Sequence, residues 1–103
     1  RNESSYVSEN NKIEFQMHNY PNPFNPETII KFQLPQPCKV ALKIYNPLGQ
    51  EIRTLVDEQR SAGYHEIKWD GKDNSSTKVG TGIYIYQLKA DDFVAVKKMI
   101  MIQ

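Results

Sequence analysis

Cysteine is almost absent from this chain of 103 residues, since Cys38 is the only one. An internal disulfide is therefore excluded, and so is a metal site built from several cysteines. The two histidines, His18 and His65, do not stand in a zinc-ligand spacing with that cysteine. We expect no cofactor, and stability has to come from the packing of apolar side chains.

Long apolar runs and an excess of one charge are lacking as well. No apolar stretch approaches the roughly 20 residues that a membrane-spanning helix needs, so no membrane insertion is expected. Thirteen Lys and Arg against twelve Asp and Glu leave a net charge of +1. The lysines are scattered among apolar positions instead of forming a basic stripe, which argues against nucleic acid as a partner.

The beginning of the chain differs in composition from the rest. Residues 1–12 are rich in Ser, Asn and charge, and we interpret them as a linker to a preceding domain. The chain opens on Arg1 without an export signal, so we expect it to be part of a longer protein. Residues 13–103 are of a size for one domain.

Apolar residues alternate with polar ones through most of residues 13–103, as half-buried strands require. The alternation predicts strands at 13–17, 28–34, 38–45, 50–56, 65–69, 83–89 and 93–102. The fourth is less regular, because Ile52, Leu55 and Val56 also match a helical spacing. Apolar residues on both faces of 83–89 indicate a central strand, whereas the inward face of 93–102 is not assignable.

Proline and glycine separate these strands. Pro21, Pro23 and Pro26 make the segment before the second strand a rigid, extended connector. Asn46-Pro47-Leu48-Gly49 suits a type I turn within a hairpin, and Asp70-Gly71 and Ala90-Asp91-Asp92 mark further turns. About seven short strands with regular turns and no convincing helix predict an antiparallel β-sandwich.

No catalytic constellation stands out. Cys38 has the phase of a buried strand residue, which favours a packed small hydrophobe over a nucleophile. His65 shares the phase of Ile67 and Trp69, which favours a hydrogen-bonded core histidine over a ligand or base. We therefore expect a protein that is not an enzyme.

Two binding hypotheses remain open from the residues alone. The oxygen-rich loop that contains Asp70 and Asp73 is a weak calcium candidate, although such residues are common in plain turns. Exposed aromatic side chains offer flat faces for stacking on sugars. The candidates for such stacking are Tyr6, Tyr20, Phe24, Tyr45, Tyr64 and Trp69.

From about Phe15 to Gln103 the chain resembles the type A C-terminal sorting domain of the type IX, or Por, secretion system. Through it, the chain resembles the immunoglobulin-like domain of the flagellar hook-capping protein. The segments that carry the resemblance are Asn19-Tyr20-Pro21-Asn22-Pro23-Phe24-Asn25-Pro26, Ile44-Tyr45-Asn46-Pro47-Leu48-Gly49-Gln50, Ala62-Gly63-Tyr64-His65, Trp69-Asp70-Gly71-Lys72-Asp73, Gly82-Ile83-Tyr84-Ile85-Tyr86 and Lys97-Lys98-Met99. Ser76 and Asp91 stand where such domains often have glycine.

The resemblance implies an all-β, immunoglobulin-like sandwich in which the motif residues are structural. These residues are Pro21, Asn22, Pro23, Phe24, Gly49, Trp69, Asp70, Gly71 and Gly82. It also implies an export signal that an outer-membrane translocon recognises after the domain folds in the periplasm of a Gram-negative bacterium. In the family a sortase-like peptidase often removes the domain at the cell surface and can attach the parent protein there. Lys97, Lys98 and Met99 would then take part in recognition by the translocon.

Two other functions compete with export. One is an accessory carbohydrate-binding module, and the other is a structural immunoglobulin-like module, each appended to a secreted hydrolase. An exposed edge strand would in addition allow a homodimer through strand pairing. The same lysines would serve equally well to protect such an edge from aggregation.

Overall fold

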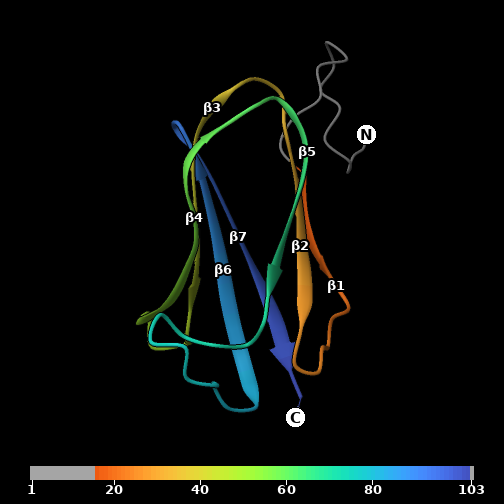
Figure 1. Ribbon diagram of the computed structural model, residues 1–103, viewed down its shortest axis with the longest axis vertical. Coiled ribbons are helices and arrows are strands. Elements are labelled where there is room, and N and C mark those ends of the chain that lie inside the picture. The colour runs from red at the N-terminus through yellow and green to blue at the C-terminus, as the bar shows by residue number, and fades with distance from the viewer. Residues whose placement is uncertain (1–15, 103) are drawn as a thin grey trace.

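The computed structural model describes residues 16–102, whose regular structure consists of seven β-strands (Figure 1). The strands are β1 (Gln16–Tyr20), β2 (Thr28–Leu34), β3 (Cys38–Tyr45), β4 (Glu51–Arg60), β5 (Gly63–Trp69), β6 (Gly82–Ala90) and β7 (Phe93–Met101). The predicted linker at 1–12 and most of the predicted first strand at 13–17 lie outside the described residues. No helix among residues 16–102 is long and apolar enough to cross a membrane.

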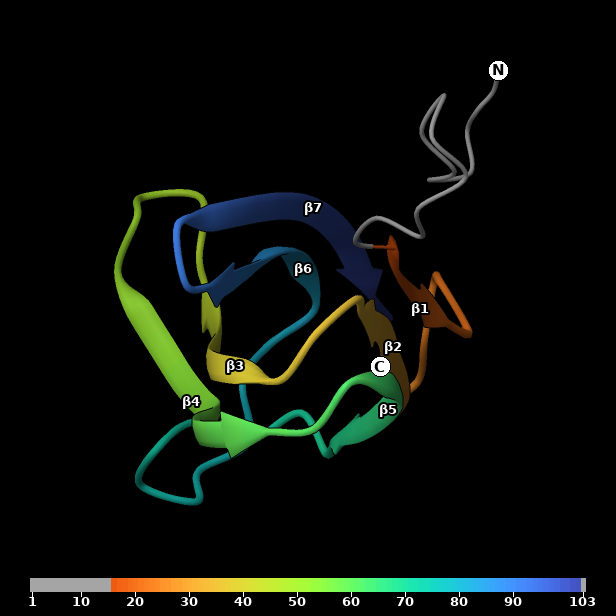
Figure 2. The ribbon, with the colours of Figure 1, turned by 90° about the horizontal axis from the view of Figure 1, so that it is seen from above.

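The seven strands form two antiparallel sheets. One has the order β1-β2-β5 and the other the order β4-β3-β6-β7. Seen from above, the sheets are two layers that face each other (Figure 2). The predicted antiparallel sandwich is confirmed, and β6 is a central strand as its apolar residues on both faces indicated.

The core lies between the sheets and follows the alternation of the strands. In β2, Ile30, Phe32 and Leu34 are buried, and the matching positions of β3 and β6 are buried opposite them. A buried polar contact links the layers, because the Tyr86 hydroxyl donates to Asn19 Oδ1 over 3.1 Å. The period of two in the sequence thus gives each sheet one apolar face, and the apolar faces of the two sheets pack against each other.

The irregular pattern of the fourth strand has a structural cause. β4 pairs with β3 at Leu42↔Val56 and then at Lys43↔Thr54, so Leu55 is an extra residue in a β-bulge. A bulge breaks the period of two, which explains why Leu55 and Val56 follow each other as apolar residues. The strand also continues to Arg60, beyond the predicted end at residue 56.

The first hairpin has the predicted turn. Gly49 N donates to Asn46 O over 2.9 Å, and Asn46 Oδ1 accepts from the backbone amides of Leu48 and Gln50. Gly49 has a φ of 84°, which a residue with a Cβ adopts only at a cost. This turn joins β3 to β4.

Two further positions adopt the left-handed conformation without being glycine. Ser76 has a φ of 65° and Asp91 a φ of 54°. These are the two positions at which the resemblance led us to expect glycine. At both positions the backbone therefore has a positive φ, which glycine adopts more easily than other residues.

Candidate docking surface around the C-terminal strand

The proline connector closes part of the free edge of β7. Phe24 N donates to Ile100 O over 2.9 Å, and Ile102 N donates to Phe24 O over 2.8 Å. Asn22 Oδ1 accepts from Ile100 N at 3.0 Å. The segment that contains Pro21, Asn22, Pro23 and Phe24 is thus a short parallel partner for the end of the last strand.

Phe24 also anchors the connector in the core. Its side chain is 2 % exposed, and its ring lies 5.6 Å from the ring of Trp69. Trp69 in turn meets the ring of Tyr84 edge to face at 5.4 Å, while its Nε1 donates to Lys72 O at 2.9 Å. Motif residues far apart in sequence therefore form one aromatic cluster at the end of the sandwich where β7 ends.

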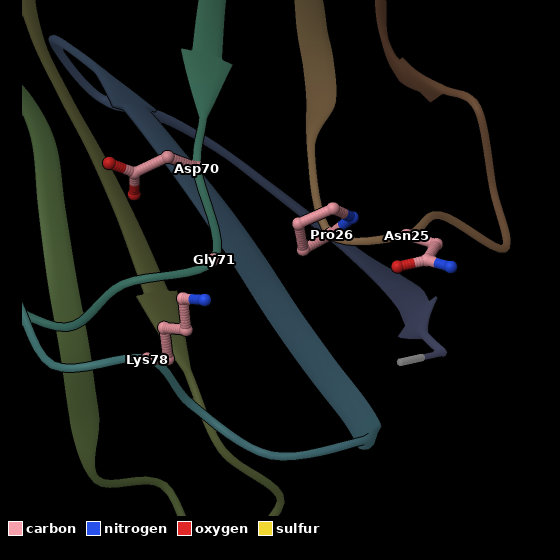
Figure 3. Close-up of a pocket in the computed structure, with 5 residues that line it drawn as sticks. All are labelled: Asn25, Pro26, Asp70, Gly71 and Lys78. Atoms are coloured by element: carbon pink, nitrogen blue, oxygen red, sulfur yellow. The ribbon is translucent and has the colours of Figure 1, made fainter.

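Gly71 lets the loop after β5 approach the connector and β7. Its φ is 78°, and an added Cβ would lie 3.0 Å from Pro26 O and 2.9 Å from the Met101 Cε atom. Beside it is a small cavity of about 170 Å³ lined by Asn25, Pro26, Asp70, Gly71 and Lys78 (Figure 3). The connector supplies one wall of this cavity, and the loop between β5 and β6 supplies the other.

Asp70 and Asp73 act within their own loop. Asp70 Oδ1 accepts from the Lys72 amide at 3.0 Å and faces Arg53 Nη1 at 3.4 Å. Asp73 Oδ1 accepts from the amides of Ser75 and Thr77, both at 2.9 Å. Within residues 16–102, no three His, Cys, Asp or Glu side chains gather as metal ligands would. Both carboxylates of the calcium candidate are thus engaged in loop contacts.

Arg53 also holds the loop after β5 in place, although the sequence did not single it out. Its guanidinium donates to Lys72 O at 3.0 Å as well as facing Asp70, and it thereby ties β4 to the loop after β5. Nothing in the alternation of β4 marks this arginine. Only the fold brings it to the loop.

The three residues proposed for recognition differ in their environment. Lys97 and Lys98 are exposed, whereas Met99 is fully buried with 0 % of its surface exposed. Met99, Met101 and the half-buried Ala95 share the inward face of β7, which the sequence did not assign. The alternation places Lys97 on this same face of β7, but its side chain is exposed to solvent. A receptor that meets the folded domain can therefore contact the two lysines but not the Met99 side chain.

The other structural motif glycines have local roles. Gly49 shapes the hairpin between β3 and β4, and no atom lies within 4 Å of the place where its Cβ would be. Gly82 begins β6 and pairs with Met101 of β7. Gly82 therefore lies beside the end of β7, whereas Gly49 lies in the hairpin between β3 and β4.

The nucleophile and base candidates do not meet. Cys38 is buried, and burial, followed by the charge of Asp91, raises the pKa of its thiol. His65 lies on the edge strand β5, half-buried, stacked on Phe32 at 5.2 Å and hydrogen-bonded to Ser61 O at 2.8 Å. It is less buried than predicted because an edge strand is covered on one side only. His18 is exposed on β1.

The aromatic candidates for sugar stacking separate into two groups. Phe24 and Trp69 are core residues, and Tyr45 is half-buried. Tyr20 and Tyr64 are 71 % and 78 % exposed on the outer face of the three-stranded sheet. A groove of about 400 Å³ runs beside Tyr20 and is lined in addition by Pro21, Glu27, Thr28, Ile29 and Lys68. Tyr6 lies outside the described residues.

Comparisons with known proteins point to one family. The family model of the FlgD Ig-like domain matches residues 19–92. A search of curated proteins finds no match. Among solved structures, FlgD from P. aeruginosa has a TM-score of 0.59 at 22% identity, over 72% of this chain and 59% of that chain.

Two longer proteins from Porphyromonas gingivalis contain a similar fold. Dimeric latent PorU superposes with a TM-score of 0.70 at 21% identity, over 85% of this chain. PorZ, described as an essential bacterial surface component of the type IX secretion system, superposes with a TM-score of 0.57 at 20% identity, over 84%. This chain spans only 9% of PorU and 11% of PorZ. At these identities the likeness establishes the fold, and the match across residues 19–92 establishes that the chain belongs to the FlgD Ig-like domain family.

Proposed function

We propose that this domain is the non-catalytic C-terminal sorting domain, of type A, of a larger secreted protein that the type IX secretion system exports. The edge position of β7 is the observation that carries the proposal. This strand displays Lys97 and Lys98 to solvent while Met99 and Met101 hold it in the core. A strand that is both anchored and accessible gives a receptor a fixed surface to recognise.

The fold shared with PorU and PorZ supports the same system, because PorZ is described as a component of it. The partners would be the outer-membrane translocon, a sortase-like peptidase and the preceding domain of the same polypeptide. The protein would reach the cell surface or the medium through the periplasm. In this function Lys97 and Lys98 contact the receptor, and Met99 keeps their strand in place.

An export assay with charge reversals tests the proposal. The 103-residue chain is fused behind a periplasm-directed fluorescent protein in a host with a working type IX system. We expect surface or medium fluorescence from the native sequence and retention of the Lys97→Glu/Lys98→Glu variant in the periplasm. The matched control is Lys72→Glu/Lys78→Glu, which changes the net charge equally on the loop after β5 and is expected to be exported. Periplasmic retention of the native sequence would refute the proposal.

A carbohydrate-binding function is the second candidate, and the exposure of Tyr20 and Tyr64 favours it. Their rings stand on the outer face of the three-stranded sheet, where flat apolar surfaces stack on sugar rings. Co-sedimentation with insoluble polysaccharides tests it. Saturable binding that both Tyr20→Ala and Tyr64→Ala weaken would support this candidate, and the absence of binding by the native chain would eliminate it for the polysaccharides used.

A further inference from the structure

In β7, the backbone amide and carbonyl groups of every second residue point away from β6, toward the edge of the sheet. The register between β6 and β7 runs without a break from Gly82↔Met101 to Ala90↔Phe93. Ile100 uses its amide and carbonyl toward Asn22 and Phe24, so both groups point away from β6. Because outward groups recur at every second residue, those of Val94, Val96 and Lys98 point outward too. No hydrogen bond between described residues uses them.

The side chains of the same residues make the neighbouring surface apolar. Val94 and Val96 are 49% and 55% exposed on the outer face of the sheet. Ile100 continues this face along β7, and Ile83 lies beside Ile100 on β6 with 44% of its surface exposed. An extended segment laid along β7 would therefore find both backbone partners and an apolar surface.

The charge at this edge is uncompensated within the part of the chain that the structure describes. Lys97 and Lys98 take part in none of the ion pairs there, unlike Lys31, Lys43 and Lys68. The two lysines follow each other in sequence and therefore stand on opposite faces of this strand, so acidic side chains are attracted to both faces of its edge.

We propose that residues 94–98 bind an extended acidic and apolar segment of a partner protein by β-strand addition. The inference rests on the proposed function, in which the partner belongs to the export machinery. Backbone groups of Val94, Val96 and Lys98 pair with the added strand. Its apolar side chains cover Val94 and Val96, and its acidic side chains neutralise the two lysines.

A partner of opposite charge fits this edge better than a second copy of the chain. Pairing two copies through residues 94–98 would gather both Lys97 and both Lys98 ammonium groups with no acid among them, and like charges on paired strands are destabilising. The connector also limits the length, because Asn22 and Phe24 already occupy the edge at Ile100 and Ile102. The added strand therefore ends beside Lys98.

A proline at the edge tests the backbone pairing directly. Val96→Pro removes an amide that points away from β6, a position at which edge strands tolerate proline. Val96→Thr keeps the amide and strand propensity and is the matched control. In the export assay we expect Val96→Pro to lower surface fluorescence by about tenfold or more. The reason is that this variant loses one backbone hydrogen bond to the added strand and misaligns the neighbouring ones. Val96→Thr is expected to remain near the native level.

The remaining outcomes separate this inference from the proposed function. Circular dichroism and a thermal melt verify that Val96→Pro folds, and Val94→Pro replaces it if it does not. Normal export of the folded proline variant, with loss of export in Lys97→Glu/Lys98→Glu, would overturn strand addition and leave the sorting function standing. No export of the native chain would overturn both. A native dimer in sedimentation experiments that Val96→Pro dissociates would show that a second copy is the partner instead.

Discussion

Replacing Gly71 by alanine tests whether the motif glycine after Trp69 is required for close packing as well as for its backbone conformation. Gly71 and Gly49 have similar φ values of 78° and 84°. A Cβ at Gly49 meets no atom within 4 Å, whereas one at Gly71 lies 3.0 Å from Pro26 O and 2.9 Å from Met101 Cε. Gly49→Ala therefore isolates the backbone cost, and Gly71→Ala adds the steric cost.

The two costs are of different size. The left-handed conformation costs a residue with a Cβ about 1–2 kcal/mol, so we expect Gly49→Ala to lower the free energy of unfolding by that amount. The Met101 end can move aside, but the Pro26 carbonyl belongs to the backbone, and overpacking of this kind costs a further ~1–3 kcal/mol. Gly71→Ala is then expected to lose about 2–5 kcal/mol in total.

Urea denaturation followed by tryptophan fluorescence measures both losses, because Trp69 is the single tryptophan and is fully buried. The urea midpoints of the variants and the native protein are compared when the slopes of their unfolding free energies against urea concentration agree. Equal slopes show that the surface exposed on unfolding is unchanged. A loss for Gly71→Ala no larger than that for Gly49→Ala would refute the role of close approach at Gly71.

Three further predictions concern the core, a strained turn and alkaline pH. Phe24→Ala should lower the free energy of unfolding by about 3–5 kcal/mol in urea denaturation, because a fully buried aromatic ring leaves a cavity beside Trp69; a loss below about 1 kcal/mol would contradict the anchoring role of the connector. Ser76→Gly should raise the thermal midpoint, since glycine relieves the left-handed φ of 65°; an unchanged or lower midpoint would show that the turn carries no strain. Burial raises the pKa of Tyr86 far above its usual range, so the neutral hydroxyl is the form that the fold favours. The stability that Tyr86 contributes is thus complete below the unfolded pKa of about 10 and is lost as the pH rises beyond it. Chemical denaturation between pH 8 and 11 should show a decline that Tyr86→Phe makes shallower, and equal declines in both proteins would contradict this.

Several features of the fold were predictable because they are local. The predicted strands at 28–34 and 38–45 have the same bounds as β2 and β3, and their apolar residues are buried at every second position, since a strand with one buried face must have a period of two. Gln33 departs from this pattern, because it lies on the opposite face of β2 from Phe32 and is nevertheless buried. The hairpin at Asn46 and Gly49 was predictable for the same reason, because turn residues satisfy or shape their own backbone. The bulge at Leu55 hid the pattern of β4, since an inserted residue changes the phase.

The candidate surface was predictable only in part. Lys97 and Lys98 were named from a resemblance in sequence, but their neighbour Met99 belongs to the core and not to the surface. Which residues lie on the inward face of β7 depends on its pairing with β6, a contact between segments that the alternation of β7 alone did not specify. Val94 and Val96 were missed for that reason.

Composition, the period of two and the turn residues were enough to predict a small sandwich of antiparallel strands, because each of these features acts within a few positions along the chain. The tertiary structure shows which of the motif residues meet. Among residues 16–102, it brings Phe24, Trp69, Gly71 and Met101 together from separate segments, closes the edge of β7 at Ile100, and leaves that edge open from Val94 to Lys98. Packing and hydrogen bonding between distant segments determine which edge is closed, and no local pattern contains that information.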